Sequence, residues 1–195
     1  MELNLNELAR EAHQIAVEHG WWEKEPTFGE LVALMHSELS EALEEYRAGN
    51  RIRPGQPTPM VYYSGGGYVA TDTTECCKKP EGIAVELADC IIRILDWAGH
   101  ENVNMDRIFF EVMEAHKDQP EEEQRFGEFI SALHNLLSMA YCDADDRNDR
   151  DIYMGLVIYY ILENMERAGV EMDAIIREKM EYNRTRPYRH GGKTL

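Results

Sequence analysis

The sequence predicts an all-α protein, a helical bundle, and two observations carry that prediction. Apolar residues recur about every 3.6 positions through long segments, most clearly over residues 27–49 and 79–99. The pattern of the first segment then recurs without gaps in the second half of the chain, over residues 125–140. Residues that favour β-strands gather in residues 51–79, where we expect one small inserted hairpin.

The first element expected is an amphipathic helix over residues 6–18. Its buried side is formed by Leu8, Ala12, Ile15 and Ala16. The helix ends at Gly20, and Trp21 and Trp22 follow in the turn. These tryptophans either fill the core or, in the functional interpretation, one of them walls a pocket and stacks on a nucleobase. We assign that second role to Trp22.

The second helix, over residues 27–49, carries carboxylates where core residues are expected. Thr27 is followed three residues later by Glu30, which fits a capping box and marks the start of the helix. Glu38 falls inside the apolar stripe of this helix, and Glu41 lies on the edge of the stripe.

The third helix, over residues 79–99, is apolar on nearly every side and keeps one narrow polar strip. Glu86, Asp89 and Arg93 lie on that strip. An ionised carboxylate in such surroundings needs a cation or a hydrogen-bond donor beside it. If the two acidic stripes face each other, four carboxylates surround one space, and all-oxygen ligands favour Mg²⁺, with Mn²⁺ as a substitute. The alternative is that these acids are solvated faces of an acidic chain.

The insertion over residues 51–79 interrupts these two helices. A proline-rich loop leads into the segment MVYYSGGGYVATD, which is typical of two short strands joined by glycines. The hairpin is either a lid over a substrate or a hairpin without a catalytic role at a dimer contact. The sequence does not separate these interpretations.

The second half of the chain indicates a tandem duplication. Phe126, Gly127 and Glu128 repeat Phe28, Gly29 and Glu30, and His134 repeats His36 at the same offset. The positions of Glu38 and Glu41 are occupied by Leu136 and Met139, while Glu86 and Asp89 fall against Leu156 and Tyr159. We therefore expect a first repeat over residues 1–118 with the acidic site and a degenerate second repeat over residues 119–195, packed as one globular domain. The acidic run over residues 143–151 is expected to be a charged loop.

Composition narrows the classes of function. The chain of 195 residues carries a formal net charge of −17, which argues against binding to nucleic acid or to an anionic membrane. It shows neither a signal-peptide pattern nor an apolar run long enough to span a membrane, so we expect a cytoplasmic protein. Four cysteines form no Cys-x-x-Cys pair and so indicate neither a zinc site nor a disulfide framework.

The C-terminal segment, residues 177–195, is a basic tail in an otherwise acidic chain. Its side chains include several donors suited to phosphate oxygens, although a solvated helix end accounts for part of this pattern. An acidic metal cage together with a basic tail is what a polyphosphate substrate requires.

Three segments resemble one known family. HSELSEALEEYRAG, KPEGIAVELADCIIRILDWAG and REKMEYNRTRPYRHGGK look like the MazG-like, all-α nucleoside triphosphate pyrophosphohydrolases, whose signature is Glu-x-x-Glu followed by Glu-x-x-Asp. The resemblance implies a Mg²⁺-dependent enzyme that converts a nucleoside triphosphate to the monophosphate and pyrophosphate. The duplicated layout is similar to that of the dimeric dUTPases, in which one chain imitates a dimer of the simpler members.

The resemblance also implies the roles of individual residues. The metal ligands would be Glu38, Glu41, Glu86 and Asp89, and the phosphate contacts would be Lys179, Asn183 and Arg186. The basic tail follows the second repeat, so it must fold back across the molecule to reach the acids. Either Glu38 or Glu41 would take the proton of the attacking water, and the sequence leaves this choice open.

Three other hypotheses compete with this function. A carboxylate-bridged di-iron bundle needs Glu-x-x-His, and no histidine of the sequence has a glutamate at that spacing. A pyrophosphatase of the same superfamily with another substrate, such as dUTP, dUDP or phosphoribosyl-ATP, and a catalytically silent helical interaction module both remain. A homodimer formed through leftover apolar surface is compatible with each of them.

Overall fold

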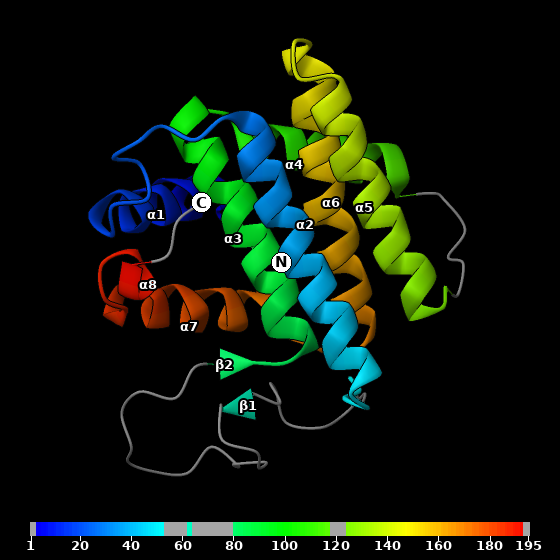
Figure 1. Ribbon diagram of the computed structural model, residues 1–195. Coiled ribbons are helices and arrows are strands. Elements are labelled where there is room, and N and C mark those ends of the chain that lie inside the picture. The colour runs from blue at the N-terminus through cyan, green and yellow to red at the C-terminus, as the bar shows by residue number, and fades with distance from the viewer. Residues whose placement is uncertain (1–2, 53–61, 64–79, 118–123, 193–195) are drawn as a thin grey trace.

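Helices account for most of the computed structural model, which describes residues 3–52, 62–63, 80–117 and 124–192 (Figure 1). The helices of this part of the chain are α1 (Leu5–Glu18), α2 (Phe28–Arg47), α3 (Ile83–Glu101), α4 (Met105–His116), α5 (Phe126–Cys142), α6 (Arg147–Arg167), α7 (Met172–Thr185) and α8 (Arg189–Gly192). Two short strands, β1 (Tyr62–Tyr63) and β2 (Pro80–Glu81), pair antiparallel. The all-α helical bundle expected from the sequence is confirmed.

The helix α3 lies in the middle of the bundle. It packs against α1 and α7 on one side and against α2 on another, and it also meets α6 (Figure 1). Of its 19 residues, 11 are buried, including Glu86. A helix that is apolar nearly all round belongs at the centre of a bundle, and this position explains why so few places on α3 accept charge.

Helix boundaries follow local capping chemistry. The Thr27 side chain accepts from the Glu30 amide while the Glu30 carboxylate accepts from the Thr27 amide, so the expected capping box starts α2. The expected start of the next helix at residue 79 is wrong. Pro80 and Glu81 pair with β1, and Gly82, at a φ of 119°, turns the chain into α3.

The expected loop over residues 143–151 is also too long. The Asp146 side chain accepts hydrogen bonds from the amides of Asn148 and Asp149, and α6 therefore begins at Arg147. Acidic and amide side chains that resemble a loop composition serve here as an N-cap and a first helical turn.

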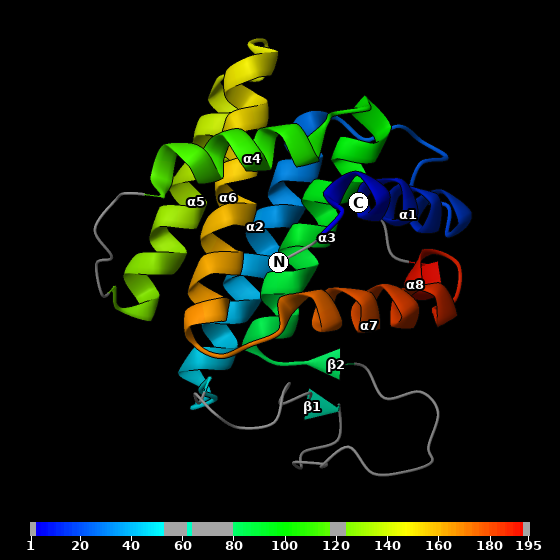
Figure 2. The same cartoon turned by 180° about the vertical axis from the view of Figure 1, so that it is seen from behind.

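Two pairs of helices cross in matching ways. α7 lies across α3, and α4 lies across α6, as Figure 2 shows from behind. α2 and α5 pack side by side, with His36 Nδ1 2.7 Å from His134 Nδ1. Contact between two residues at equivalent positions is what a two-fold-like arrangement of repeats produces. The tandem duplication stays a prediction, and these crossings are compatible with it.

Most of the expected hairpin over residues 51–79 lies outside the described residues. Within it, Tyr62 and Tyr63 pair with Glu81 and Pro80, at the start of α3. Among the helices of the described ranges, none combines the length and the apolar character that crossing a membrane requires.

Candidate functional site

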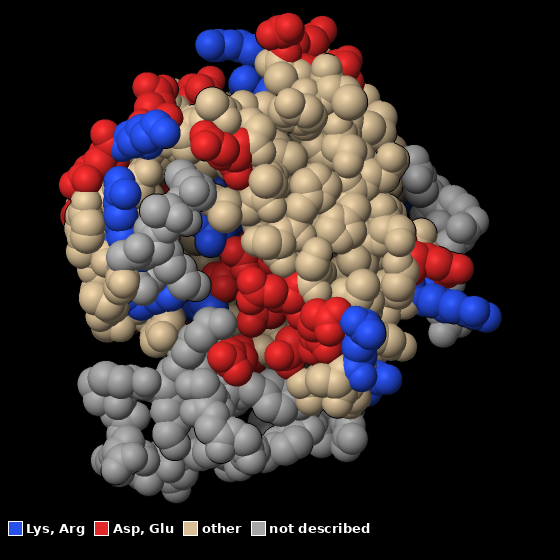
Figure 3. Space-filling model, viewed as in Figure 1, with Lys and Arg blue, Asp and Glu red and all other residues tan. Residues whose placement is uncertain are grey.

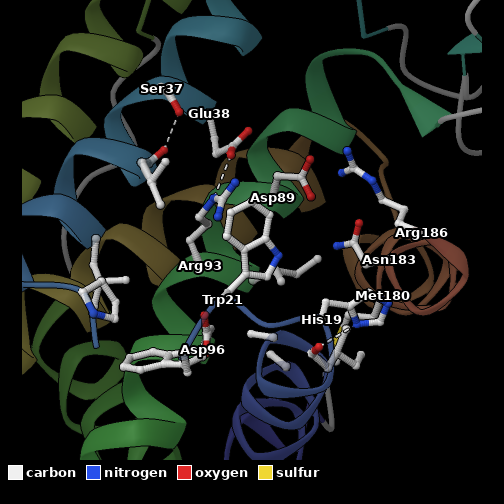
Figure 4. Close-up of a pocket in the computed structure, with 18 of the residues that line it drawn as sticks. His19, Trp21, Ser37, Glu38, Asp89, Arg93, Asp96, Met180, Asn183 and Arg186 are labelled. Carbon is white, nitrogen blue, oxygen red and sulfur yellow. Dashed lines mark hydrogen bonds and ion pairs between the residues drawn. The ribbon is translucent and has the colours of Figure 1, made fainter. Parts of the chain in front are cut away.

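A cavity of about 340 Å³ lies between α1, α2, α3 and α7 (Figure 4). One end is acidic, with Glu38, Glu41 and Asp89 in its lining. The other end is aromatic, because the turn after α1 brings Trp21 and Trp22 to the same cavity. Its size is within the range of small-molecule sites.

Three carboxylates meet at the acidic end. One oxygen from each of Glu38, Glu41 and Glu86 can be chosen so that the three lie within 4.8 Å of one another. Glu38 is 5 % exposed and Glu86 is 3 % exposed, whereas Glu41 is open to solvent. The acidic stripes of α2 and α3 therefore face each other, and Figure 3 shows acidic side chains gathered on this face over the two helices.

Asp89, the fourth predicted ligand, lies outside that group of three and forms an ion pair. Its Oδ2 is 2.7 Å from Nζ of Lys179, which is 1 % exposed and also donates to the Pro80 carbonyl at 3.3 Å. The tail thus folds back across the molecule onto α3. Lys179 binds a carboxylate in this structure, and its ammonium is not directed at open space where a phosphate would lie.

Arg93 is a site residue to which the sequence pattern assigned no role. Its Nε donates to Oε1 of Glu38 at 2.8 Å. Burial raises the pKa of Glu38, Arg93 lowers it, and the neighbouring charges of Asp89 and Glu41 raise it again. The net direction is upward, and burial is the largest cause.

Helix α7 forms the wall opposite the acids. Asn183 lines the cavity from this helix, and Arg186 lines it from the C-cap (Figure 4). The buried Asn183 Oδ1 has no hydrogen-bond partner within the described ranges. The Arg186 amide donates to the Asn183 carbonyl, and its guanidinium lies over the Tyr182 ring without an ion pair to any described acid. Burial lowers the pKa of Arg186, and Tyr182 and Asp89 oppose this shift. Both side chains keep polar capacity for a ligand.

At the aromatic end, the partly buried Asp96 binds Trp22. Trp22 Nε1 donates to Oδ1 of Asp96 at 2.9 Å, and His13 Nδ1 lies at the same distance from that oxygen. Trp22 also stacks on His100, with ring centroids 4.1 Å apart. Burial raises the pKa of Asp96, while the contacts with His13 and Trp22 lower it. Trp21 lines the same cavity and is a second candidate for stacking on a ligand.

The cavity follows one side of α3. Asp89, Arg93 and Asp96 line it, and Glu86 lies one turn before Asp89 on the same helix. At about 1.5 Å per residue, Glu86 and Asp96 lie about 15 Å apart along the axis. This arrangement can hold a divalent cation at one end and a flat ring at the other, which suits a ligand with a phosphate chain and a base.

Comparison with protein-family models, with curated proteins and with solved structures finds no match to this chain. The resemblance to the MazG-like family therefore rests on the three sequence motifs, and the chemistry of the site on its own residues.

Proposed function

We propose that this chain is a Mg²⁺-dependent nucleoside triphosphate pyrophosphohydrolase that converts a ribo- or deoxynucleoside triphosphate and water to the monophosphate and diphosphate. The observation that supports it most is the meeting of Glu38, Glu41 and Glu86 at one end of a cavity whose other end is aromatic. Asn183 and Arg186 flank the space between these ends.

The residues present fit a hard divalent cation. All three converging ligands are carboxylates, which Mg²⁺ prefers, and the nearby charges of Asp89 and Glu41 both act to raise the pKa of Glu38. Glu38, Glu41 and Glu86 would hold the ion, and Asp89, which gives Oδ2 to Lys179, has Oδ1 left for the same purpose. When bound, the ion neutralises phosphate charge and lowers the pKa of a bound water.

The α7 wall and the tryptophans would bind the substrate. Arg186 presents a planar set of N–H donors that matches phosphate oxygens, and the Asn183 amide adds donor and acceptor capacity. Trp21 and Trp22 offer flat surfaces to a base, and every base has a π-face that stacks on an aromatic ring. The enclosed lining limits the water around the phosphates and strengthens these contacts.

Glu41 is our choice for the residue that accepts the proton of the attacking water. Glu38 already accepts from Arg93, whereas Glu41 has no hydrogen bond from any described side chain and faces solvent at the cavity mouth. The water oxygen forms a new bond to phosphorus, the anhydride between the α and β phosphates breaks, and Glu41 retains the proton. Diphosphate leaves with the electron pair of the broken bond.

Product analysis tests this proposal. Purified protein is incubated with each nucleoside triphosphate, with and without Mg²⁺, and the products are separated by ion exchange. Equal amounts of monophosphate and diphosphate, formed only with the metal and lost in Glu86→Gln, would support the proposal. Release of orthophosphate alone, or no turnover by folded protein, would contradict it.

A further inference from the structure

The end of the chain holds the turn that carries the tryptophans. Tyr188 donates its hydroxyl hydrogen to Glu23, and the Arg189 amide donates to the His19 carbonyl at 3.0 Å. The Arg189 guanidinium donates through Nε to the Gly20 carbonyl at 3.2 Å and lies 3.6 Å from Glu23. These contacts join residues that are more than 160 positions apart, and all of them fall on residues 19–23.

Gly20 is fitted to the tyrosine ring. Its φ is +80°, a conformation that residues with a Cβ rarely adopt. A Cβ built on Gly20 would lie 2.2 Å from Cε2 of Tyr188, so the ring occupies the space that a side chain would need. Arg189 has a φ of 44°, which is uncommon outside glycine and is kept only where surrounding contacts impose it.

Residues 19–23, which Tyr188 and Arg189 contact, include the side chains that form the aromatic end of the cavity. His19, Trp21 and Trp22 all line it, and none of them belongs to a regular helix. The amides of His19, Gly20 and Trp21 bond back to α1, so other contacts must hold the side of the turn that leads away from this helix. Tyr188 and Arg189, which do not line the cavity, provide such contacts.

We propose that Tyr188 and Arg189 are positioning residues, which fix the aromatic wall and thereby set the affinity for the base of the substrate. The part concerning substrate affinity rests on the proposed function, and the part concerning the wall does not. The basic tail was expected to meet phosphate. Arg189 is turned away from that role, because its guanidinium lies on the Gly20 carbonyl and Glu23.

The experiment compares Tyr188→Ala with Tyr141→Ala in the full-length chain. Tyr141 is a matched control, because it is 56 % exposed against 52 % for Tyr188, and its ring also packs over a glycine, Gly29. It lies on α5, away from the cavity lining. Tyr188→Phe, which keeps the ring and loses only the bond to Glu23, serves as a milder variant should Tyr188→Ala unfold.

Two readouts are measured on each variant. With the best triphosphate and Mg²⁺, Tyr188→Ala is expected to raise KM about tenfold and to change kcat less than about twofold, since loss of stacking weakens base binding. Acrylamide quenching of tryptophan fluorescence reports the wall directly. Of the three tryptophans, Trp97 is 2 % exposed, so added quenching arises from Trp21 and Trp22.

The outcomes separate the two proposals. Increased quenching and a raised KM in Tyr188→Ala, with Tyr141→Ala unchanged in both, would support the positioning role. Unchanged quenching in Tyr188→Ala and Tyr188→Phe would overturn it, whatever the activity. If the wild type hydrolyses no triphosphate but quenching still increases in Tyr188→Ala, the proposed function is wrong. The proposal that Tyr188 and Arg189 position the tryptophans is then still supported. A fall in kcat at constant KM would also overturn the assignment to base binding.

Discussion

Two helix crossings that the predicted duplication relates, α7 with α3 and α4 with α6, differ in their chemistry. Where α7 crosses α3, Lys179 and Asp89 form a buried ion pair. The segment MDRIFFEVM, residues 105–113, aligns with MDAIIREKM, residues 172–180, which places Val112 at the position of Lys179. Where α4 crosses α6, Val112 and Tyr159 belong to a small apolar cluster with Ile108. Apolar side chains therefore suffice to hold such a crossing.

This difference bears on why the charges are present. A buried ion pair is weak evidence for stability, because its desolvation cost rivals its attraction and apolar replacements are often neutral or better. The counterpart has Leu136 and Met139 where the site has Glu38 and Glu41. The aligned positions hold apolar residues instead of these acids. The gathering of the acids around one cavity is therefore better explained by a role in binding or catalysis than by a role in helix packing.

The strongest test of this difference substitutes two aligned positions, Glu41 and Met139, and compares the activities of the variants. Glu41→Gln is expected to lower kcat about 10²–10⁴-fold, the usual range for loss of a general base. Met139→Gln places the same amide at the aligned position of the predicted second repeat and is expected to leave kcat unchanged. The measurement is the steady-state release of diphosphate at saturating triphosphate and Mg²⁺.

The stability of the same variants provides a control. Removing the charge of Glu41 relieves repulsion on Glu38, so Glu41→Gln is expected to be at least as stable as the wild type without metal. Equal losses of activity in Glu41→Gln and Met139→Gln would mean that the two halves do not differ in function, and the site assignment would fall.

The next largest effect concerns the ion pair itself. Lys179→Met leaves the carboxylate of Asp89, which is 15 % exposed, without its partner, and we expect a loss of about 3 kcal/mol of unfolding free energy. Adding Asp89→Leu makes the crossing apolar, like its counterpart, and should recover most of that loss. Urea denaturation measures both variants.

A second pair on α7 serves as the control for that experiment. Arg177 and Asp173 form an ion pair with both side chains about half exposed, so Arg177→Met should cost less than about 1 kcal/mol. If the double variant is no more stable than Lys179→Met alone, the crossing of α7 with α3 requires its charges. That result would contradict the inference from the apolar crossing of α4 with α6.

The carboxylate cluster was predictable because it depends on helical spacing. Glu38 and Glu41, like Glu86 and Asp89, are three residues apart, which places each pair on one face whatever the rest of the chain does. The ion pair of Asp89 with Lys179 was not predictable in this way. It depends on how α7 crosses α3, and no periodicity along either helix encodes that crossing.

The turn after α1 shows a related limit. Trp21 and Trp22 are adjacent and lie outside any regular helix, so no pattern decides which one faces a ligand. The engagement of Trp22 with Asp96 and His100 became visible only in the structure. The start of α6 was missed for a different reason, since the acids that cap it are the same residues that favour loops.

The effect of Mg²⁺ on the unfolding free energy tests whether the carboxylate cluster binds the metal. Mg²⁺ at about 100 times its dissociation constant is expected to raise the unfolding free energy by about 2.7 kcal/mol if it binds only the folded state. Glu38→Gln should abolish most of this gain. Glu166→Gln, which removes an exposed acid from α6 and matches the change in net charge, should preserve it. A gain that survives in Glu38→Gln would place the metal elsewhere.

The smallest expected effect lies where the two halves meet, at His36 and His134. Burial lowers the pKa of both imidazoles, and the proximity of His36 lowers the pKa of His134 further. Their Nδ1 atoms are 2.7 Å apart, so one ring donates to the other and both cannot be protonated together.

The sign of the pH dependence follows from these lowered values. Above the ordinary histidine pKa, near 6.5, folded and unfolded chains are both neutral at these positions and the stabilisation is complete. As the pH falls below that value, the unfolded chain binds protons that the folded pair resists, and stability declines until the folded pair itself is protonated. Urea denaturation from pH 8 to pH 5.5 should therefore show a steeper decline for the wild type than for the double variant His36→Gln, His134→Gln. Because that variant keeps every carboxylate, equal slopes would mean that the two histidines bind protons equally in the folded and unfolded chains, contrary to the lowered pKa values.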